Sequence, residues 1–158
     1  MSKIDSNYEF IPAEEKHIEA LVADIAPDTA GELQKLLPET PLEDIVRMLM
    51  KDSTEAWVAM FDGELICAFG IKKGTMLSDT AHPWLVVTNL LQKHKKNFLW
   101  ASKIGIAYWL KKYGVLDNWI PFGFPKILRW LKWAGFTIGP PTKPRNQTQI
   151  FYHIEMRL

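Results

Sequence analysis

Cysteine is nearly absent from the sequence: Cys67 is the only one among 158 residues. A single thiol excludes an internal disulfide and any cysteine-rich metal site, and it fits a reducing compartment. No run of residues approaches the roughly 18 apolar side chains of a membrane span, and the N-terminal residues lack the apolar segment of a signal peptide. The sequence therefore predicts a soluble protein of a cytoplasm. Because Cys67 shares one face of a predicted strand with Leu65, Phe69 and Ile71, we expect it to be buried and inert.

Net charge and histidine pairs are lacking too. The formal net charge is +1 at pH 7, so no global field steers the chain to nucleic acid or membrane. Nucleic-acid binding would have to use the basic residues between Lys93 and Lys132 with their interleaved Trp and Tyr, and it is the weakest function class that we weigh. None of the four histidines pairs with another at metal-ligand spacing, so no metal site is expected.

Tryptophan, by contrast, is abundant, with seven residues. Such large apolar areas favour either an aromatic core or an interface that uses some of them. Apolar residues make up 47% of the chain and charged residues 23%, as in an ordinary globular protein. The length predicts one domain over residues 1–158 with a substantial core.

The N-terminal part predicts a short strand over residues 8–11, followed by three amphipathic helices. The helices are expected over residues 13–25, 29–37 and 41–51. Asp28 is expected to cap the second helix. Thr40 and Glu43 have the spacing of a capping box for the third. His17 falls on the polar side of the first.

Two β-rich runs follow, over residues 55–61 and 64–71. Asp62-Gly63 joins them, and this dipeptide between two such runs is the strongest short signal of a β-hairpin. We therefore expect an antiparallel pair of strands here.

The middle of the chain predicts a loop, a strand and a long helix. The loop is expected over residues 75–83 and contains His82. The continuous apolar run over residues 84–88 is typical of a strand in the middle of a sheet. The helix is expected over residues 98–113, and Gly114 should end it.

A proline and a glycine frame the next helix. Pro125 suits the first position of a helix and Gly135 the position just past its end. The apolar stripe of this helix consists of Ile127, Trp130, Leu131 and Ala134. The opposite side carries Lys126, Arg129, Lys132 and Trp133. An exposed Trp beside Arg and Lys has the composition of a protein-contact hot spot; the other interpretation is that this Trp covers a neighbouring loop.

Two further strands are expected near the C-terminus, over residues 115–120 and 147–157. In the last strand one face carries Ile150, Tyr152, Ile154 and Met156, and the other carries Phe151, His153, Glu155 and Arg157. Asp79 and Asp117 lie near strand ends, where active-site bases often lie, but both also suit plain turn chemistry, which is the favoured interpretation.

The element order is strand, helices, hairpin, central strand, helix, strand, helix, strand. Together with a short last helix that ends in Gly-Phe, this order resembles the GNAT acyltransferase fold. The resemblance implies a single α/β domain in which a mixed, mostly antiparallel central sheet is flanked by helices.

Several segments carry a narrower resemblance, which runs from Phe10 to the C-terminus. They are Asp62-Gly63, Ala68-Phe69-Gly70, Pro83-Trp84-Leu85, Lys93-His94-Lys95-Lys96 before Phe98-Leu99, the run from Arg129 to Phe136, and Gly139-Pro140-Pro141. In this order they resemble a family of GNAT-like proteins of short-tailed phages, some described as internal virion proteins or virion-morphogenesis factors. The resemblance implies a phage origin and a place in the host cytoplasm or the virion. It implies no established chemistry.

Working GNAT enzymes hold the pyrophosphate of acyl-CoA on a turn, Gln/Arg-x-x-Gly-x-Gly/Ala, between the central strand and the next helix. Glycine lets backbone N–H groups approach the phosphates. The corresponding residues 89–98 contain no glycine, so we expect no cofactor. If acetyl-CoA does bind, the side chains that would meet its phosphates are Lys93, His94, Lys95, Lys96 and Asn97. Otherwise these residues form a solvated basic turn.

The proton donor of the superfamily is missing as well. An Asn commonly stands eleven residues before the Gly of Gly-Phe, and a Tyr four residues before it donates a proton to the leaving thiolate. Phe124 and Leu131 occupy those positions here, and neither side chain can donate a hydrogen bond. Tyr152 and His153 are the weak candidates for a replacement, although a Tyr and a His on a strand are more often structural.

The sequence therefore supports two hypotheses on function. The first is a phage-encoded GNAT-fold protein, catalytically degenerate, that acts by protein contacts in virion assembly or on a host target. The second is an active acyl-CoA-dependent N-acyltransferase with a divergent phosphate-binding turn. The sequence leaves the partner, the substrate and the oligomeric state open.

Overall fold

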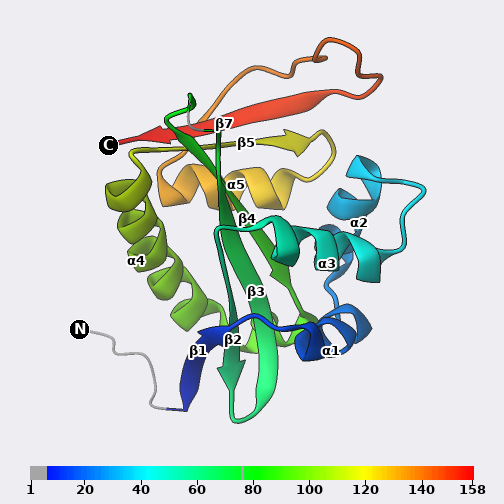
Figure 1. The fold of residues 1–158 in the computed structure, drawn as a ribbon, viewed down its shortest axis with the longest axis vertical. Helices are drawn as coiled ribbons and strands as arrows, with labels where there is room; N and C mark the ends of the chain where they lie inside the picture. The colour runs from blue at the N-terminus through cyan, green and yellow to red at the C-terminus, as the bar shows by residue number, and fades with distance from the viewer. Residues whose placement is uncertain (1–6, 76) are drawn as a thin grey trace. The chain divides into compact units, whose positions relative to one another are not determined.

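The computed structural model describes residues 7–75 and 77–158; residues 1–6, where no signal peptide is predicted, and Met76, in the predicted loop, lie outside that description. Seven strands form one sheet in the order β1-β2-β3-β4-β5-β7-β6 (Figure 1). The strands are β1 Tyr8–Pro12, β2 Glu55–Phe61, β3 Glu64–Lys73, β4 Thr80–Val87, β5 Val115–Pro121, β6 Thr137–Ile138 and β7 Phe151–Arg157. The helices are η1 Glu15–His17, α1 Ile18–Ala23, α2 Pro27–Leu36, α3 Leu42–Asp52, η2 Asn89–His94, α4 Lys95–Tyr113 and α5 Pro125–Ala134.

This sheet confirms the predicted α/β fold with a mixed, mostly antiparallel sheet. Strand β4 is fourth of seven in the order, as its apolar run predicts. It pairs with β5 in parallel, whereas β2 runs antiparallel to β1 and β3, and β7 runs antiparallel to β5 and β6. Contacts divide the chain into two compact units: Met1–Lys72 with Trp84–Ala101, and Lys73–Pro83 with Ser102–Leu158. The division falls inside β4 and α4.

The hairpin of the first unit is the predicted one. Asp62 has φ 48° and Gly63 has φ 80°, the pair of positive values that a two-residue type I′ turn requires. Strands β2 and β3 pair from Phe61 opposite Glu64 to Glu55 opposite Ile71, with one irregularity in the register beside Ala59. The local sequence therefore sets both the turn and the register.

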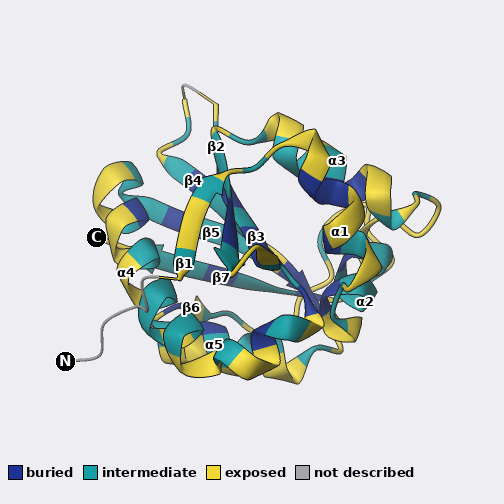
Figure 2. Cartoon of the chain, turned by 90° about the horizontal axis from the view of Figure 1, so that it is seen from below, coloured by how far each residue is buried: buried dark blue, intermediate teal, exposed yellow. Residues whose placement is uncertain are grey.

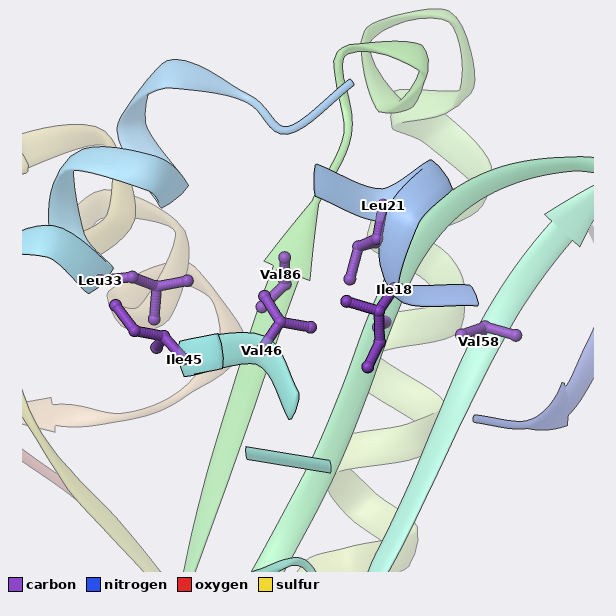
Figure 3. Close-up of a cluster of buried hydrophobic side chains, with 8 residues drawn as sticks. Ile18, Leu21, Leu33, Ile45, Val46, Val58 and Val86 are labelled. Carbon is purple, nitrogen blue, oxygen red and sulfur yellow. The ribbon is translucent and has the colours of Figure 1, made fainter. Parts of the chain in front are cut away.

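Helices α1, α2 and α3 bury their apolar residues in the core of the first unit, against β2, β3 and β4. Figure 3 shows the side chains of this core. Its buried residues are Ile18, Leu21, Leu33, Ile45, Val46, Val58, Ala68 and Val86. The amphipathic pattern thus identifies the correct faces, because burial of the apolar stripe is what holds such helices on a sheet.

The predicted helix starts differ from those of the structure. Helix α2 begins at Pro27 with Ala26 as its N-cap, so Asp28 lies inside the helix and is not its cap. Helix α3 begins after Pro41, with no side-chain cap, so the predicted capping box of Thr40 and Glu43 is absent. Pro27 stands at the first position of α2, where its fixed φ suits a helix start, whereas Pro41 is itself the N-cap residue of α3.

His17 is buried, which contradicts its predicted place on a polar face. The predicted helix over residues 13–25 begins instead with the 3₁₀ turn η1, and the tighter winding changes which residues face the core. The Glu14 N–H donates to His17 Nδ1 at 2.9 Å. Burial, and secondarily the charge of Lys16, lowers the pKa of His17.

Cys67 is buried, as predicted. Burial raises the pKa of its thiol to about 12, so the thiolate is scarce at neutral pH and the side chain serves as core.

Among the residues that the structure describes, no helix has both the length and the apolar character of a membrane span.

Strand β4 begins four residues before its predicted start and includes a proline. Pro83 has no N–H to donate to a neighbouring strand, which makes this stretch look like a loop. The ladder with β5 pairs Thr80 with Val115 and Ala81 with Leu116. Just beyond it, the Asn118 side-chain amide donates to the carbonyl of Pro83 at 2.9 Å. A side chain thus continues the link where the proline interrupts the backbone pattern.

The second unit holds β5, α5, β6 and β7. Helix α5 spans the predicted residues, and Gly135 ends it with φ 112°, a left-handed conformation that favours glycine. The closing strand β7 begins at Phe151 rather than at residue 147. Ile150, predicted to lie in this strand with its apolar face, precedes it and is exposed. The Pro-rich loop before it therefore extends further than the alternation predicts.

Candidate functional site

A 3₁₀ helix occupies the segment where GNAT enzymes hold phosphate. Helix η2 follows Thr88 directly and runs on into α4. The Thr88 hydroxyl donates to the Leu65 and Ile66 carbonyls at 2.9 and 2.7 Å. The Asn89 N–H donates to the Asp24 carbonyl at 2.9 Å, and the Leu91 N–H donates to the Thr88 carbonyl at 3.2 Å. These N–H groups are committed to the protein, so they offer no cradle to a pyrophosphate.

The predicted phosphate contacts divide into two groups. His94 and Asn97 both turn to Tyr8 of β1: Nδ1 of His94 is hydrogen-bonded to the Tyr8 hydroxyl, and Asn97 Nδ2 donates to that hydroxyl at 2.9 Å. The His94 ring also lies 4.6 Å from the ring of Phe61. The second group consists of the other three predicted phosphate contacts, Lys93, Lys95 and Lys96, which are exposed. Sequence reasoning missed Tyr8, which precedes its partners by more than 80 residues.

Helix α5 has no proton donor at the positions where the superfamily carries its Asn and Tyr. Leu131 is buried at 5% exposure, and Phe124 is the N-cap residue of the helix. Both side chains are hydrocarbon, so neither can protonate a leaving thiolate.

Two imidazoles flank one carboxylate in the second unit, and we call these residues the His–Asp–His cluster: His82 of β4, Asp117 of β5 and His153 of β7. The parallel register places His82 beside Asp117, one residue beyond the pair Ala81–Leu116. On the other side, β7 pairs antiparallel with β5 and brings Trp119 opposite His153. Three strands that are distant in sequence thus converge on Asp117.

The contacts within the cluster fix the orientation of both rings. His153 Nε2 lies 2.9 Å from Asp117 Oδ2. His82 Nδ1 lies 3.0 Å from the main-chain carbonyl of Asp117 and 2.9 Å from its Oδ1. Only the contact with the carbonyl has hydrogen-bond geometry, which leaves the buried Oδ1 without a hydrogen-bond partner. We therefore take the carbonyl as the acceptor for His82.

The cluster can hold and move protons. In the tautomers that donate from Nε2 of His153 and Nδ1 of His82, the other ring nitrogens keep their lone pairs. The side chain of His153 is 33% exposed and that of Asp117 17%, so a substrate can reach the ring while the carboxylate behind it stays shielded. The Trp119 ring lies 4.8 Å from the His153 ring. A carboxylate that orients an imidazole is the arrangement of a general base.

The two predicted catalytic candidates do not lie together. Successive residues of a strand point to opposite faces, so Tyr152 points away from the face of His153. Its ring stacks on that of Phe122 at 6.0 Å. Asp117 lies within β5, inside the strand predicted over residues 115–120, so the turn role that the sequence favoured for it is wrong. Among residues 7–75 and 77–158, no group of three or more His, Cys, Asp or Glu side chains, the His–Asp–His cluster included, is arranged to hold a metal ion.

The predicted contact face of α5 is exposed. It comprises Lys126, Arg129, Lys132 and Trp133. Trp133 is 46% exposed, and Nζ of Lys103 lies 4.4 Å from the centre of its ring. The ring is therefore partly covered by a lysine of α4, a cation–π contact.

Comparison with solved structures identifies the fold. RimL, a ribosomal L7/L12 alpha-N-protein acetyltransferase in complex with coenzyme A, superposes with a TM-score of 0.72 and 10% identity, over 99% of this chain and 97% of that one. The fold is that of the GNAT acetyltransferases. A GNAT acetyltransferase from Bacillus anthracis gives a TM-score of 0.68 at 16% identity, over 98% and 96% of the two chains. A ribosomal-protein-alanine N-acetyltransferase from Brucella melitensis gives 0.66 at 14%, over 95% and 99%.

The similarity to these acetyltransferases is one of structure alone. No protein-family model matches the sequence, and no curated protein matches it either. At such low identity the shared GNAT fold says nothing of activity or substrate. The narrower resemblance to phage proteins stays a prediction.

Proposed function

We propose that this GNAT-fold protein has lost acyl transfer and acts through protein contacts. The observation that carries the proposal is that the N–H groups of Thr88, Asn89 and Leu91 donate to carbonyls of the protein, at the start of the segment where a phosphate cradle would need free N–H groups. The hydrocarbon side chain of Leu131, in place of a proton donor, supports it independently. The resemblance to phage proteins suggests the setting: virion assembly or a host target, in the host cytoplasm or the virion.

Acyl-CoA fits this chain poorly. Its pyrophosphate would need several converging N–H groups at a helix start, and here Asn89 and Leu91 donate theirs to carbonyls of the protein. Two of the five predicted side-chain contacts, His94 and Asn97, are likewise engaged with Tyr8. What remains is the exposed ammonium groups of Lys93, Lys95 and Lys96, which water and salt screen strongly.

Acetyl-CoA should leave the thermal stability of the protein unchanged. A ligand that binds only the folded state stabilises it by about 2.7 kcal/mol at a concentration of 100 times its Kd, which in a chain of this size raises the melting temperature by several degrees. We expect a shift below about 1 °C at about 1 mM acetyl-CoA, measured by differential scanning calorimetry beside a GNAT enzyme that binds the compound. A shift of several degrees that the triple substitution of Lys93, Lys95 and Lys96 by Ala abolishes would refute the proposal.

A second candidate function is supported by the His–Asp–His cluster. It is an active acyl-CoA-dependent N-acyltransferase with a divergent phosphate-binding turn. His153, held by Asp117, would accept the proton that an acceptor amine loses when it becomes an amide. Acceptor deprotonation of this kind contributes roughly 10²- to 10⁴-fold to a rate.

This candidate predicts thiol release from acetyl-CoA in the presence of a suitable amine, followed with a thiol reagent over a panel of polyamines and peptide N-termini. If the cluster is the base, His153→Gln and Asp117→Asn should each reduce the rate by about 100-fold. Tyr152→Phe is the matched control, because Tyr152 neighbours His153 in sequence and points to the other face; its rate should stay at the wild-type value. Release no faster than the uncatalysed reaction across the panel would eliminate the candidate.

A further inference from the structure

The small net charge conceals a strong separation of charge along the chain. Residues 1–64 contain 5 basic and 15 acidic residues, a net charge of −10. Residues 65–158 contain 14 basic and 3 acidic residues, a net charge of +11. A near-zero total therefore arises from two large and opposite charges along the sequence.

The positive charge gathers on α4, which the division between the units crosses, and on α5 of the second unit. Neither α4 nor α5 contains an Asp or Glu. From residue 102 onward, exposed apolar side chains lie among their basic residues, and Figure 2 shows the exposed outer sides of both helices. We call this the basic–aromatic surface: Lys103, Ile104, Tyr108, Lys111, Arg129, Lys132 and Trp133. The contact of Lys103 with the Trp133 ring joins its two helices.

A complementary surface lies on α2, α3 and the turn between them, in the first unit. Leu36, Leu37 and Met48 are exposed there. The same elements carry three exposed acidic residues that form no ion pair or hydrogen bond with any residue that the structure describes: Asp28, Glu39 and Asp52. We call this the acidic–apolar surface, defined by these six residues. It combines the opposite charge with the same exposure of large apolar side chains.

We propose that copies of this protein associate with one another, the basic–aromatic surface of one copy binding the acidic–apolar surface of the next. Opposite charges speed such an encounter and fix its orientation, and burial of the apolar side chains stabilises the complex. Because two different surfaces meet, each copy can exchange both contacts with one partner or engage two other copies, so the assembly is a reciprocal dimer, a ring or an open chain. A near-zero net charge also favours association.

A nucleic acid is a poorer match for the basic–aromatic surface. Single-stranded nucleic acids bind by stacking bases on open aromatic faces. Here Lys103 lies over the Trp133 ring, and Lys112 lies 5.8 Å from the centre of the Tyr108 ring. Ile104, at 52% exposure, would gain little from phosphate but would be covered by the apolar residues of a second copy.

Sedimentation of the purified chain tests self-association. We expect complexes at about 100 µM protein in low salt, with Kd rising at least about tenfold between 50 mM and 500 mM NaCl, because exposed charge pairs are screened by salt. Sedimentation velocity over a concentration series gives both the size and the Kd. A monomer at every concentration in low salt would refute the inference, and so would a monomer that is retained on duplex DNA through the same lysines.

Charge reversal tests which surfaces meet. One variant carries Lys103→Glu, Lys111→Glu and Arg129→Glu; the other carries Asp28→Lys, Glu39→Lys and Asp52→Lys. Each alone should be monomeric, because one of its two surfaces is repelled. Mixed in equal amounts they should form complexes again, since each keeps the surface that the other needs. Two monomers that stay apart in the mixture would contradict the pairing.

The control variant is Glu9→Lys with Glu64→Lys, two exposed residues of β1 and β3 that belong to neither surface. It should associate like the wild type. If it does not, the loss of association in the charge-reversal variants comes from the changed net charge and not from the two surfaces. Circular dichroism melts check that every variant folds. Self-association does not depend on the loss of acyl transfer, so this experiment and the acetyl-CoA experiment can fail separately.

Discussion

Replacement of Glu32 by Gln is expected to raise the free energy of unfolding by about 2 kcal/mol above pH 7. Glu32 lies half-buried on α2, and no hydrogen bond or ion pair joins it to the residues that the structure describes. Burial raises the pKa of its carboxyl from 4.5 to about 7. A pKa difference of one between the folded and unfolded chain corresponds to about 1.4 kcal/mol, and the water that still reaches the carboxylate reduces the full value of about 3 kcal/mol.

The direction of the change in unfolding free energy follows from proton binding to Glu32. Between pH 4.5 and about 7 the folded chain keeps the Glu32 proton that the unfolded chain has released, so its stability falls as the pH rises through this window. The amide of the Glu32→Gln variant has no proton to lose. The difference in unfolding free energy between variant and wild type should therefore be near zero at pH 4.5 and grow to its full value by about pH 8.

Urea unfolding at several pH values measures this difference. The lowered pKa of His17 gives the wild type a pH dependence of its own, which cancels in the difference because both proteins carry His17. Glu19→Gln on α1 is the matched control, since Glu19 is exposed, and its effect should be small and independent of pH. A Glu32→Gln effect that is equally constant with pH would show that Glu32 is ionised in the folded chain.

Gly70→Ala should destabilise the first unit by about 2–3 kcal/mol. A Cβ at residue 70 would lie 2.6 and 2.7 Å from two ring atoms of Trp84 and 2.8 Å from the carbonyl oxygen of Glu55. The Trp84 ring cannot simply turn away, because its Nε1 donates to Ser53 Oγ at 2.7 Å. The added methyl group must therefore push the indole or separate two paired strands.

A double-mutant cycle with Trp84→Phe tests whether the Trp84 ring is what crowds the new methyl group at residue 70. Phe lacks the two ring atoms that crowd the new methyl group, so the two substitutions together should cost about 1 kcal/mol less than the sum of their separate effects. Gly105→Ala on α4 is the control: its Cβ would meet nothing within 4 Å, and the helix should gain about 1 kcal/mol. Strict additivity of Gly70→Ala and Trp84→Phe would exclude the ring as the obstacle.

The sequence predicts those elements best whose signals are local. Asp62-Gly63 determines its hairpin through the φ angles that these two residues tolerate, and Pro125 and Gly135 frame α5 for the same kind of reason. The starts of α2 and α3 show the limit of such rules, because the predicted caps Asp28 and Thr40 are displaced by Ala26 and Pro41 as the N-cap residues.

The candidate site depends on contacts that no local pattern reveals. His82 falls in a predicted loop and Asp117 near the end of a predicted strand, and only the parallel register of β4 and β5 brings them together. The same holds for Tyr8, which engages His94 and Asn97 from the far end of the chain. The absence of glycine after β4, by contrast, is visible in the sequence, and the structure adds where the N–H groups of Asn89 and Leu91 go.

The interleaved course of the chain has a consequence for its synthesis. Val86 lies in the same core cluster as Ile18, Leu21 and Val46, yet residues 73–83 belong to the other unit. On the ribosome, α1, α2 and α3 therefore cannot complete their core until the segment Trp84–Ala101 has left the exit tunnel. Until then the nascent chain exposes the apolar stripes of these helices, and a fragment that stops before Trp84 would do so permanently, which makes it a substrate for chaperones and proteases.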